Sequence, residues 1–185
     1  MLDTSDFKNG STFEFEGQVY TVIWFQHHKP GKGGAVMRTK MRNVRSGSII
    51  ERTFKSGVKF REVEIERKKK QYLYNDAKNY KFMDLETFEE VSITAEKLGD
   101  TVKYLKENTE VEGLYIDGEF LNIDLPLNIE LKVISTVPGV KGDTVSNVTK
   151  PATLETGAEV GVPLFINEGD TILVDTRTGE YLQRK

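Results

Sequence analysis

The chain has 185 residues and no cysteine, and its 26 basic and 29 acidic residues leave a formal net charge of −3. The lack of cysteine excludes disulfides, cysteine nucleophiles and thiolate metal sites. A composition of 37% hydrophobic and 30% charged residues predicts a globular protein, and no stretch approaches the ~20 apolar residues of a membrane span or reads as a leader, so we expect a cytoplasmic location.

Residues 1–62 alternate between β-prone stretches and turn residues. Thr12 to Glu16 alternates with Phe13 and Phe15 on one face, and Gly17-Gln18 forms a turn before the next stretch. The spacing predicts strands at 12–16, 19–25, 36–44, 49–54 and about 58–63. Five short strands at this spacing indicate a small β-barrel.

Residues 26–36 join two of these strands and contain nothing that could build a core. Lys32 has Gly31 and Gly33 on either side, with Lys29 and Pro30 before them. Glycine permits positive φ and proline fixes φ, so the stretch predicts a protruding hairpin with Lys32 at its tip. Arms of about four residues, at roughly 3.3 Å each, would hold the amine ~13 Å beyond the barrel. Such a tip suits a narrow anionic site, although a flexible hairpin with a solvated lysine would have the same composition.

Residues 63–126 predict a second barrel with one short helical segment. Strands are expected at 71–74, 79–84, 113–116 and 119–123, with Thr94 capping 95–98 and Asp100 capping a helix at 101–107. The basic run at 67–70 could contact nucleic acid, but lysines along a solvated strand edge are the interpretation we favour.

Residues 127–185 predict a third barrel, with strands at 129–134, 140–146, 159–166, 171–175 and 181–182. The expected fold class is therefore all-β. It comprises an N-terminal barrel over 1–62, an OB-type barrel over 63–126 and a C-terminal OB-type barrel over 127–185. OB-type barrels often bind oligonucleotides, but a fold alone does not establish a function.

Charge differs between these three segments. Residues 1–62 carry a net charge of +5, residues 63–126 of −6 and residues 127–185 of −2. Alternate residues of a strand share a face, so Arg38, Lys40 and Arg42 should form one basic row, continued by Arg45 in the turn. A basic end attached to acidic segments favours phosphate contact at that end, whereas a merely solvated basic face is the alternative.

The signatures of common enzymes are missing from the sequence. A phosphate-binding loop would need glycine where Gln26 stands and a hydroxyl residue where Gly33 stands. His27 and His28 are adjacent and point to opposite faces of a strand, so no zinc site or catalytic triad can be assembled from them. We therefore expect neither enzymatic activity nor a cofactor nor a metal.

Four motifs in chain order resemble bacterial translation elongation factor P. The loop Lys29-Pro30-Gly31-Lys32-Gly33 resembles that of its first domain, and Lys141-Gly142-Asp143-Thr144 resembles a loop of its third domain. The other two motifs are the stretch 80–89 and the C-terminal stretch 150–181. His28 and Val36 depart from the pattern, in which a small aliphatic residue and a phenylalanine are expected.

The resemblance implies an L-shaped monomer with an SH3-like or KOW-like first barrel, bound to the ribosome between the peptidyl and exit sites. It implies that Lys32 positions the acceptor end of the peptidyl-site tRNA at stalling sequences such as consecutive prolines, and that a lysine-modifying enzyme extends this side chain. The implied contacts with tRNA or the ribosome are Lys29, Pro30, Gly31, Lys32, Gly33, Arg38, Lys40, Arg42, Gly142, Asp143, Thr144, Tyr181 and Arg184.

A general OB-type RNA-binding protein acting off the ribosome is the alternative function. It would need aromatic side chains on an exposed barrel face for base stacking. Most of the phenylalanines and tyrosines instead occupy core positions in the alternation, which favours the translation factor.

Overall fold

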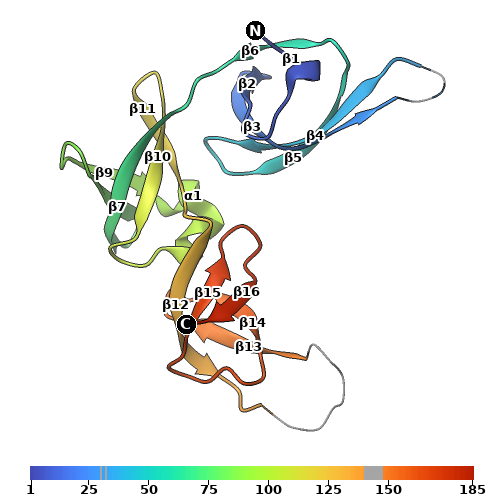
Figure 1. Cartoon of the computed structure of the whole chain (residues 1–185). Coiled ribbons are helices and arrows are strands. Elements are labelled where there is room, and N and C mark those ends of the chain that lie inside the picture. The colour runs from blue at the N-terminus through green and yellow to red at the C-terminus, as the bar shows by residue number, and fades with distance from the viewer. Residues whose placement is uncertain (30, 32, 140–147) are drawn as a thin grey trace. The chain divides into compact units, whose positions relative to one another are not determined.

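The computed structural model describes residues 1–29, 31, 33–139 and 148–185. Within these residues the chain forms three β-sheets, one short α-helix and two 3-10 segments (Figure 1). The predicted all-β class is confirmed.

The first sheet has the strand order β1-β6-β2-β3-β4-β5. Its strands are β1 (Leu2–Asp3), β2 (Thr12–Phe15), β3 (Gln18–His28), β4 (Val36–Asn43), β5 (Ile49–Lys55) and β6 (Lys59–Glu62), with a 3-10 turn at Thr4–Asp6. Aromatic rings fill its core: the centroids of Phe13 and Phe60 lie 4.7 Å apart, and those of Phe54 and Phe60 lie 4.9 Å apart. β1 escaped prediction because two residues carry no detectable periodicity.

The second sheet has the order β11-β10-β7-β8-β9. Its strands are β7 (Glu66–Asp76), β8 (Asn79–Asp84), β9 (Glu90–Thr94), β10 (Glu110–Ile116) and β11 (Glu119–Asp124). Between β9 and β10 lie α1 (Ala95–Leu98) and a 3-10 helix at Gly99–Tyr104. The expected helix at 101–107 is therefore wrong: Gly99 has a φ of 56°, which ends α1 and leaves a second, tighter turn in place of a longer helix.

Lys70 corrects the edge-strand interpretation of the basic run at 67–70. β7 is the middle strand of its sheet, and the Lys70 side chain is fully buried. Its Nζ donates to an Asp84 carboxylate oxygen at 2.8 Å. One lysine of the run therefore forms a buried ion pair, because side chains alternate between the two faces along β7 and that of Lys70 points inward.

The third sheet has the order β14-β13-β12-β15-β16. Its strands are β12 (Asn128–Thr136), β13 (Thr149–Leu154), β14 (Glu159–Pro163), β15 (Thr171–Asp175) and β16 (Tyr181–Arg184). The first half of β12 pairs with β15 and its second half pairs with β13, with a register shift between Val133 and Ser135. Such a bulge bends the strand so that one strand serves both sides of a curled sheet.

Two further strands, β13 and β9, were not predicted from the sequence, and each omission has a physical reason. β13 contains Pro151, which normally argues against a strand. β9 follows directly on a turn rich in glutamate and lacks a clear apolar run. The predicted strand at 140–146 lies outside the described residues.

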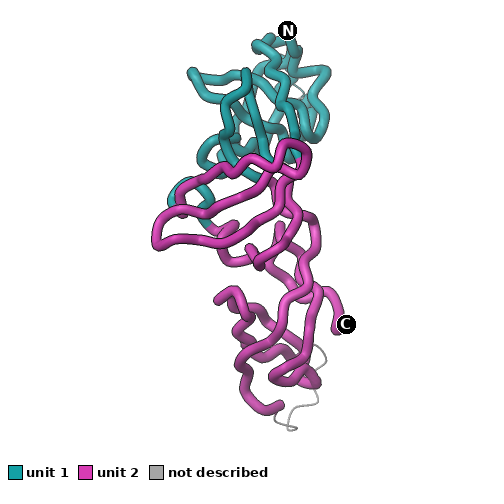
Figure 2. The backbone as a smooth tube through the Cα atoms, turned by 90° about the vertical axis from the view of Figure 1, so that its left-hand side faces the viewer, with its two compact units in different colours: residues 1–68, 96–99, 113–123 teal, residues 69–95, 100–112, 124–185 magenta. Residues whose placement is uncertain are grey.

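The chain divides into two compact units (Figure 2). The first comprises residues 1–68, 96–99 and 113–123, and the second comprises 69–95, 100–112 and 124–185. The aromatic core of the first sheet belongs to the first unit. An aliphatic core that includes Leu131, Leu154 and Ile172 belongs to the second.

One six-residue turn recurs in all three sheets, at 43–48, 84–89 and 175–180. In each, the side-chain oxygen of the first residue, Asn or Asp, accepts from the backbone N–H groups of the third and fourth residues. Its backbone carbonyl accepts from the fifth N–H, and its own N–H donates to the sixth carbonyl. The hydroxyl of the fourth residue, Ser or Thr, accepts from the sixth N–H. The fifth residue has a positive φ in every case.

Candidate nucleic-acid interface

The hairpin formed by β3 and β4 carries most of the predicted site residues (Figure 1). The two strands pair from Tyr20 opposite Asn43 out to His28 opposite Val36. β5 supports the hairpin over the same distance, because Val36 pairs with Lys55 and the carbonyl of Ala35 accepts from Ser56 N–H at 2.9 Å. The hairpin is thus part of a three-stranded ladder as far as Val36, so its strands are paired with β5 rather than forming a free arm.

Residues 29–35 form the connection, of which the structure describes all but Pro30 and Lys32. Lys29, Gly31 and Gly33 are exposed. Gly33 has a φ of 111°, a conformation that other residues rarely adopt. The structural environment of Pro30 and Lys32 lies outside the described residues.

His28 and Val36, the two departures from the expected motif, face each other in the last pair of the β3–β4 ladder. His28 is exposed and Val36 is half-buried. Because they are cross-strand neighbours, the two departures act on one position, where the hairpin enters its connecting loop.

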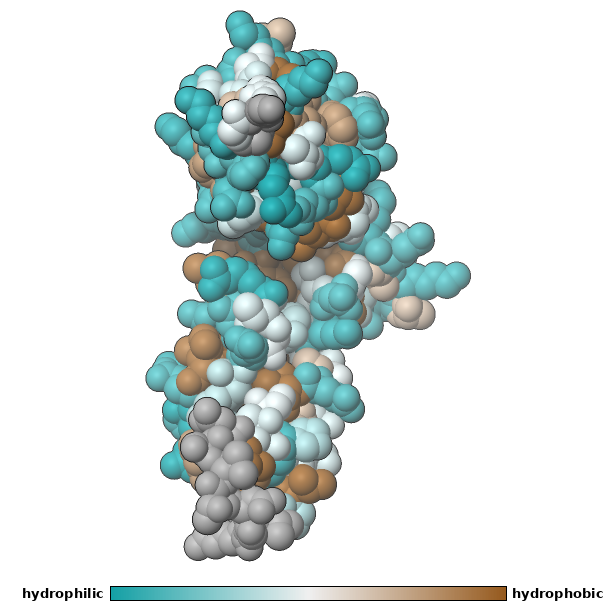
Figure 3. All heavy atoms as spheres, turned by 90° about the vertical axis from the view of Figure 1, so that its right-hand side faces the viewer, coloured by the Kyte–Doolittle hydropathy of each residue, from teal (hydrophilic) through white to brown (hydrophobic). Residues whose placement is uncertain are grey.

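Arg38, Lys40 and Arg42 lie on one face of β4, and Met37, Thr39, Met41 and Asn43 are buried on the other. Arg38 forms a 2.9 Å ion pair with Glu51 of β5, and Lys40 Nζ lies 5.8 Å from the centroid of the Trp24 ring. In the view of Figure 3, hydrophilic residues cover much of the surface of the N-terminal part of the chain, with apolar residues between them. The arrangement offers cations and one half-exposed aromatic ring to a ligand.

Arg45, expected to continue this basic row, is engaged elsewhere. Its guanidinium donates two hydrogen bonds to the Glu119 carboxylate, at 2.9 and 2.8 Å. The pair raises the pKa of Arg45 and lowers the pKa of Glu119, chiefly through these bonds. The basic row therefore ends at Arg42, because the turn after β4 directs the next arginine toward β11.

The predicted contacts in the third sheet are only partly described. Tyr181 is half-buried and packs against the aliphatic core. The Arg184 guanidinium lies 5.5 Å from the Phe165 ring centroid and 3.9 Å from an Asp170 carboxylate oxygen. Gly142, Asp143 and Thr144 lie outside the described residues.

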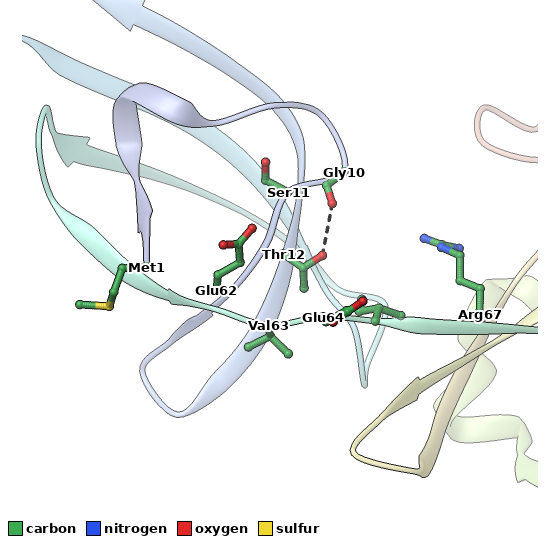
Figure 4. Close-up of a pocket in the computed structure, with 9 residues that line it drawn as sticks. Met1, Gly10, Ser11, Thr12, Glu62, Val63, Glu64 and Arg67 are labelled. Carbon is green, nitrogen blue, oxygen red and sulfur yellow. Dashed lines mark hydrogen bonds between the residues drawn. The ribbon is translucent and has the colours of Figure 1, made fainter.

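The first unit contains a polar hollow of about 630 Å³ beside the start of β2 (Figure 4). Residues 10–12 line one side and residues 62–65 with Arg67 the other, and the Thr12 hydroxyl donates to the Gly10 carbonyl at 3.2 Å. No histidine lines the hollow. Among the described residues no cluster of histidine and carboxylate side chains could hold a metal ion, and no helix is long and apolar enough to cross a membrane.

Three family models match consecutive parts of the chain. The “Elongation factor P (EF-P) KOW-like domain” matches residues 3–60, the “Elongation factor P (EF-P) OB domain” matches 65–123, and “Elongation factor P, C-terminal” matches 129–184. Full-length relatives agree with the models. Elongation factor P of Endomicrobium trichonymphae is 55% identical over 184 residues, and that of Pelotomaculum thermopropionicum is 54% identical, each with 100% of both chains covered.

The chain belongs to the elongation factor P family. The resemblance read from the four motifs is thereby confirmed, as are the KOW-like first barrel and the OB-type barrel that follows it. Elongation factor P is a translation factor rather than an enzyme, which agrees with the expectation from sequence. The basic β4 face and the hairpin consequently belong to the KOW-like domain of a translation factor.

Proposed function

We propose that this elongation factor P binds the ribosome beside the peptidyl-site tRNA and promotes peptide-bond formation at stalling sequences such as consecutive prolines. Lys32 contacts the acceptor end of that tRNA, and the basic row of Arg38, Lys40 and Arg42 contacts nearby phosphates. Membership of the family, together with the placement of this row beside the hairpin loop, supports the proposal. The chain acts in the cytoplasm as a monomer of three domains, divided near residues 62 and 126.

The mechanism follows from the chemistry of proline as an acceptor. Its nitrogen is secondary and its ring restricts φ, so consecutive prolines disfavour the reactive geometry. Where a reaction depends on orientation, a misplacement of about 1 Å can cost ~100-fold in rate. A factor that holds the peptidyl-tRNA end in the reactive pose restores the rate without supplying an acid or a base.

Lys32 brings a cation to phosphates and ribose hydroxyls, and a lysine-modifying enzyme extends its reach. A three-stranded base supports this role, because the β3–β4–β5 ladder holds the loop ends in one register as far as Val36. A rigid base reduces the conformational entropy lost when the loop binds.

The test combines a stalling assay with mass measurement. Lys32→Ala should abolish rescue of a proline-run reporter in translation with purified components, while a reporter without prolines is translated at the same rate. The intact mass of the protein from its own host should show a group attached at Lys32. Full rescue by Lys32→Ala would contradict the assigned role of this residue.

A further inference from the structure

The fifth position of the recurring turn differs in one of its three copies. It is Gly47 in the first sheet and Gly179 in the third, with φ values of 72° and 74°. In the second sheet it is Phe88, with a φ of 58°. Left-handed backbone is strained for a residue that has a Cβ, whereas glycine adopts it freely. The chain therefore carries a phenylalanine where its own two equivalent turns use the unstrained residue.

Packing within the barrel does not account for this phenylalanine. Phe88 is 71% exposed, the largest exposed fraction among the large apolar residues that follow Met1 in the described part of the chain. A ring in that position contributes little buried apolar area to folding. Strain at an exposed position of a fixed structure is characteristic of residues that act on a partner.

The turn holds Phe88 rigidly. Its N–H donates to the Asp84 carbonyl at 2.9 Å, and the Asp84 side chain accepts from the N–H groups of Glu86 and Thr87 at 2.9 and 3.0 Å. The same carboxylate is anchored by the buried Lys70. An aromatic ring presented by so constrained a backbone loses little entropy when it binds.

The charges around the Phe88 ring favour a protein over RNA as its partner. Glu86 and Glu89 are exposed on the same turn, Glu90 is exposed at the start of β9 with Lys81 Nζ 3.6 Å from its carboxylate, and residues 63–126 carry a net charge of −6. Carboxylates flanking the ring repel phosphates, so stacking on an RNA base is disfavoured. A protein surface with an apolar pocket rimmed by lysine or arginine complements both the ring and its acidic neighbours.

We propose that Phe88 is a docking residue that inserts into an apolar pocket on a basic ribosomal protein. The choice of the ribosome as the partner's location rests on the proposed function. Two of the three turns form with glycine, so the turn itself does not need the Phe88 ring. The ring serves this contact and slightly lowers folding stability.

Phe88→Gly in the full chain separates docking from folding. Its Tm should be at least that of the wild type, and up to about 2–4 °C higher, because the backbone strain at position 88 is removed. Its affinity for bacterial ribosomes should fall at least ~10-fold, as for a buried aromatic anchor. Phe88→Tyr, which keeps the ring, should bind as the wild type does. Glu86→Lys with Glu89→Lys should weaken binding and reverse its salt dependence at this site.

A photoreactive benzoylphenylalanine at position 88 identifies the partner. Cross-linking of the ribosome-bound chain to a basic ribosomal protein supports the proposal. Cross-links confined to ribosomal RNA, unchanged ribosome affinity of Phe88→Gly, or a Tm lowered by this substitution would each overturn it while leaving the proposed function in place. If the wild-type chain itself does not bind ribosomes, the proposed function fails and this inference fails with it.

Discussion

The buried pair of Lys70 and Asp84 should make the second sheet unusually sensitive to single substitutions. Lys70 is fully buried, and its ammonium lies 2.8 Å from the Asp84 carboxylate, whose side chain is only 8% exposed. Removing one partner of a buried ion pair typically costs about 3–5 kcal/mol, because the other charge stays in a medium of low polarity. Asp84→Asn should therefore reduce the free energy of unfolding by roughly this amount.

The two single substitutions should differ in size. Lys70→Met leaves the Asp84 carboxylate with two backbone N–H donors, so its cost should lie near the lower end of the ~3–5 kcal/mol range. Asp84→Asn removes the counter-charge of a fully buried ammonium and should lie near the upper end. The double variant, Lys70→Met with Asp84→Asn, should have a free energy of unfolding within about 1 kcal/mol of the wild type. Replacing both members of a buried ion pair by uncharged groups often changes stability little. Asn43, which forms the same hydrogen bonds in the first sheet, shows that asparagine can hold this turn.

The pH dependence has a defined sign. Hydrogen bonds from Lys70 and from the N–H groups of Thr87 and Glu86 hold the pKa of Asp84 well below its ordinary value of 3.8. A carboxyl whose pKa is lowered by folding contributes stability that is present above the unfolded pKa and is lost as the pH falls through the folded pKa. Acid destabilisation below pH ~4 should be shallower in Asp84→Asn, by up to about 1.4 kcal/mol per pH unit.

Urea unfolding followed by circular dichroism, with hydrogen exchange of the β7 and β8 amides, measures these effects. Exchange is needed because the single tryptophan, Trp24, lies in the first sheet and does not report on the second. The reasoning is refuted if Asp84→Asn costs less than ~1 kcal/mol, the value typical of an exposed ion pair. It is equally refuted if the double variant is as unstable as Asp84→Asn, the single variant that is expected to be the less stable of the two.

Three further predictions concern the first sheet and its hairpin. Replacing Arg38, Lys40 and Arg42 by Gln should weaken ribosome binding and flatten its dependence on salt, by a log–log slope of about 0.7–0.9 per lost phosphate contact; wild-type affinity and slope would show that the row is only solvated surface. Lys32→Ala should change the free energy of unfolding by no more than about 0.5 kcal/mol, because the sequence predicts a loop tip, and urea titration checks this. Lys40→Glu should reduce iodide quenching of Trp24 fluorescence, since the ammonium lies 5.8 Å from the ring centroid and attracts the anion; equal quenching in both proteins would place the cation elsewhere in solution.

Periodicity and turn chemistry were sufficient for much of the fold. Strict alternation along β4 placed Arg38, Lys40 and Arg42 opposite a buried row, and this follows from the backbone geometry of any strand. The strands β2 to β6, the short helical segment and the family itself were likewise readable from residues that lie close in the sequence. Local sequence patterns are sufficient to predict those elements whose conformation is determined within one segment.

Sequence reasoning missed the recurring turn, although a signal for it exists. Each copy reads Asn or Asp at the first position and Ser or Thr at the fourth, with glycine at the fifth in two of them. Phe88 concealed the pattern in the second sheet, because a phenylalanine does not indicate a positive φ. Only the backbone geometry showed that the three turns are equivalent.

The sequence by itself determined the class of the fold, the family and the position of the basic row along the chain, because these depend on composition and on short-range spacing. Tertiary structure alone decided which charged residues have partners. Lys70 meets Asp84 across 14 residues and Arg45 meets Glu119 across 74, so one lysine of a basic run is buried and one arginine leaves the basic row. Long-range pairing of this kind depends on which strands become neighbours in a sheet, and no local pattern specifies it.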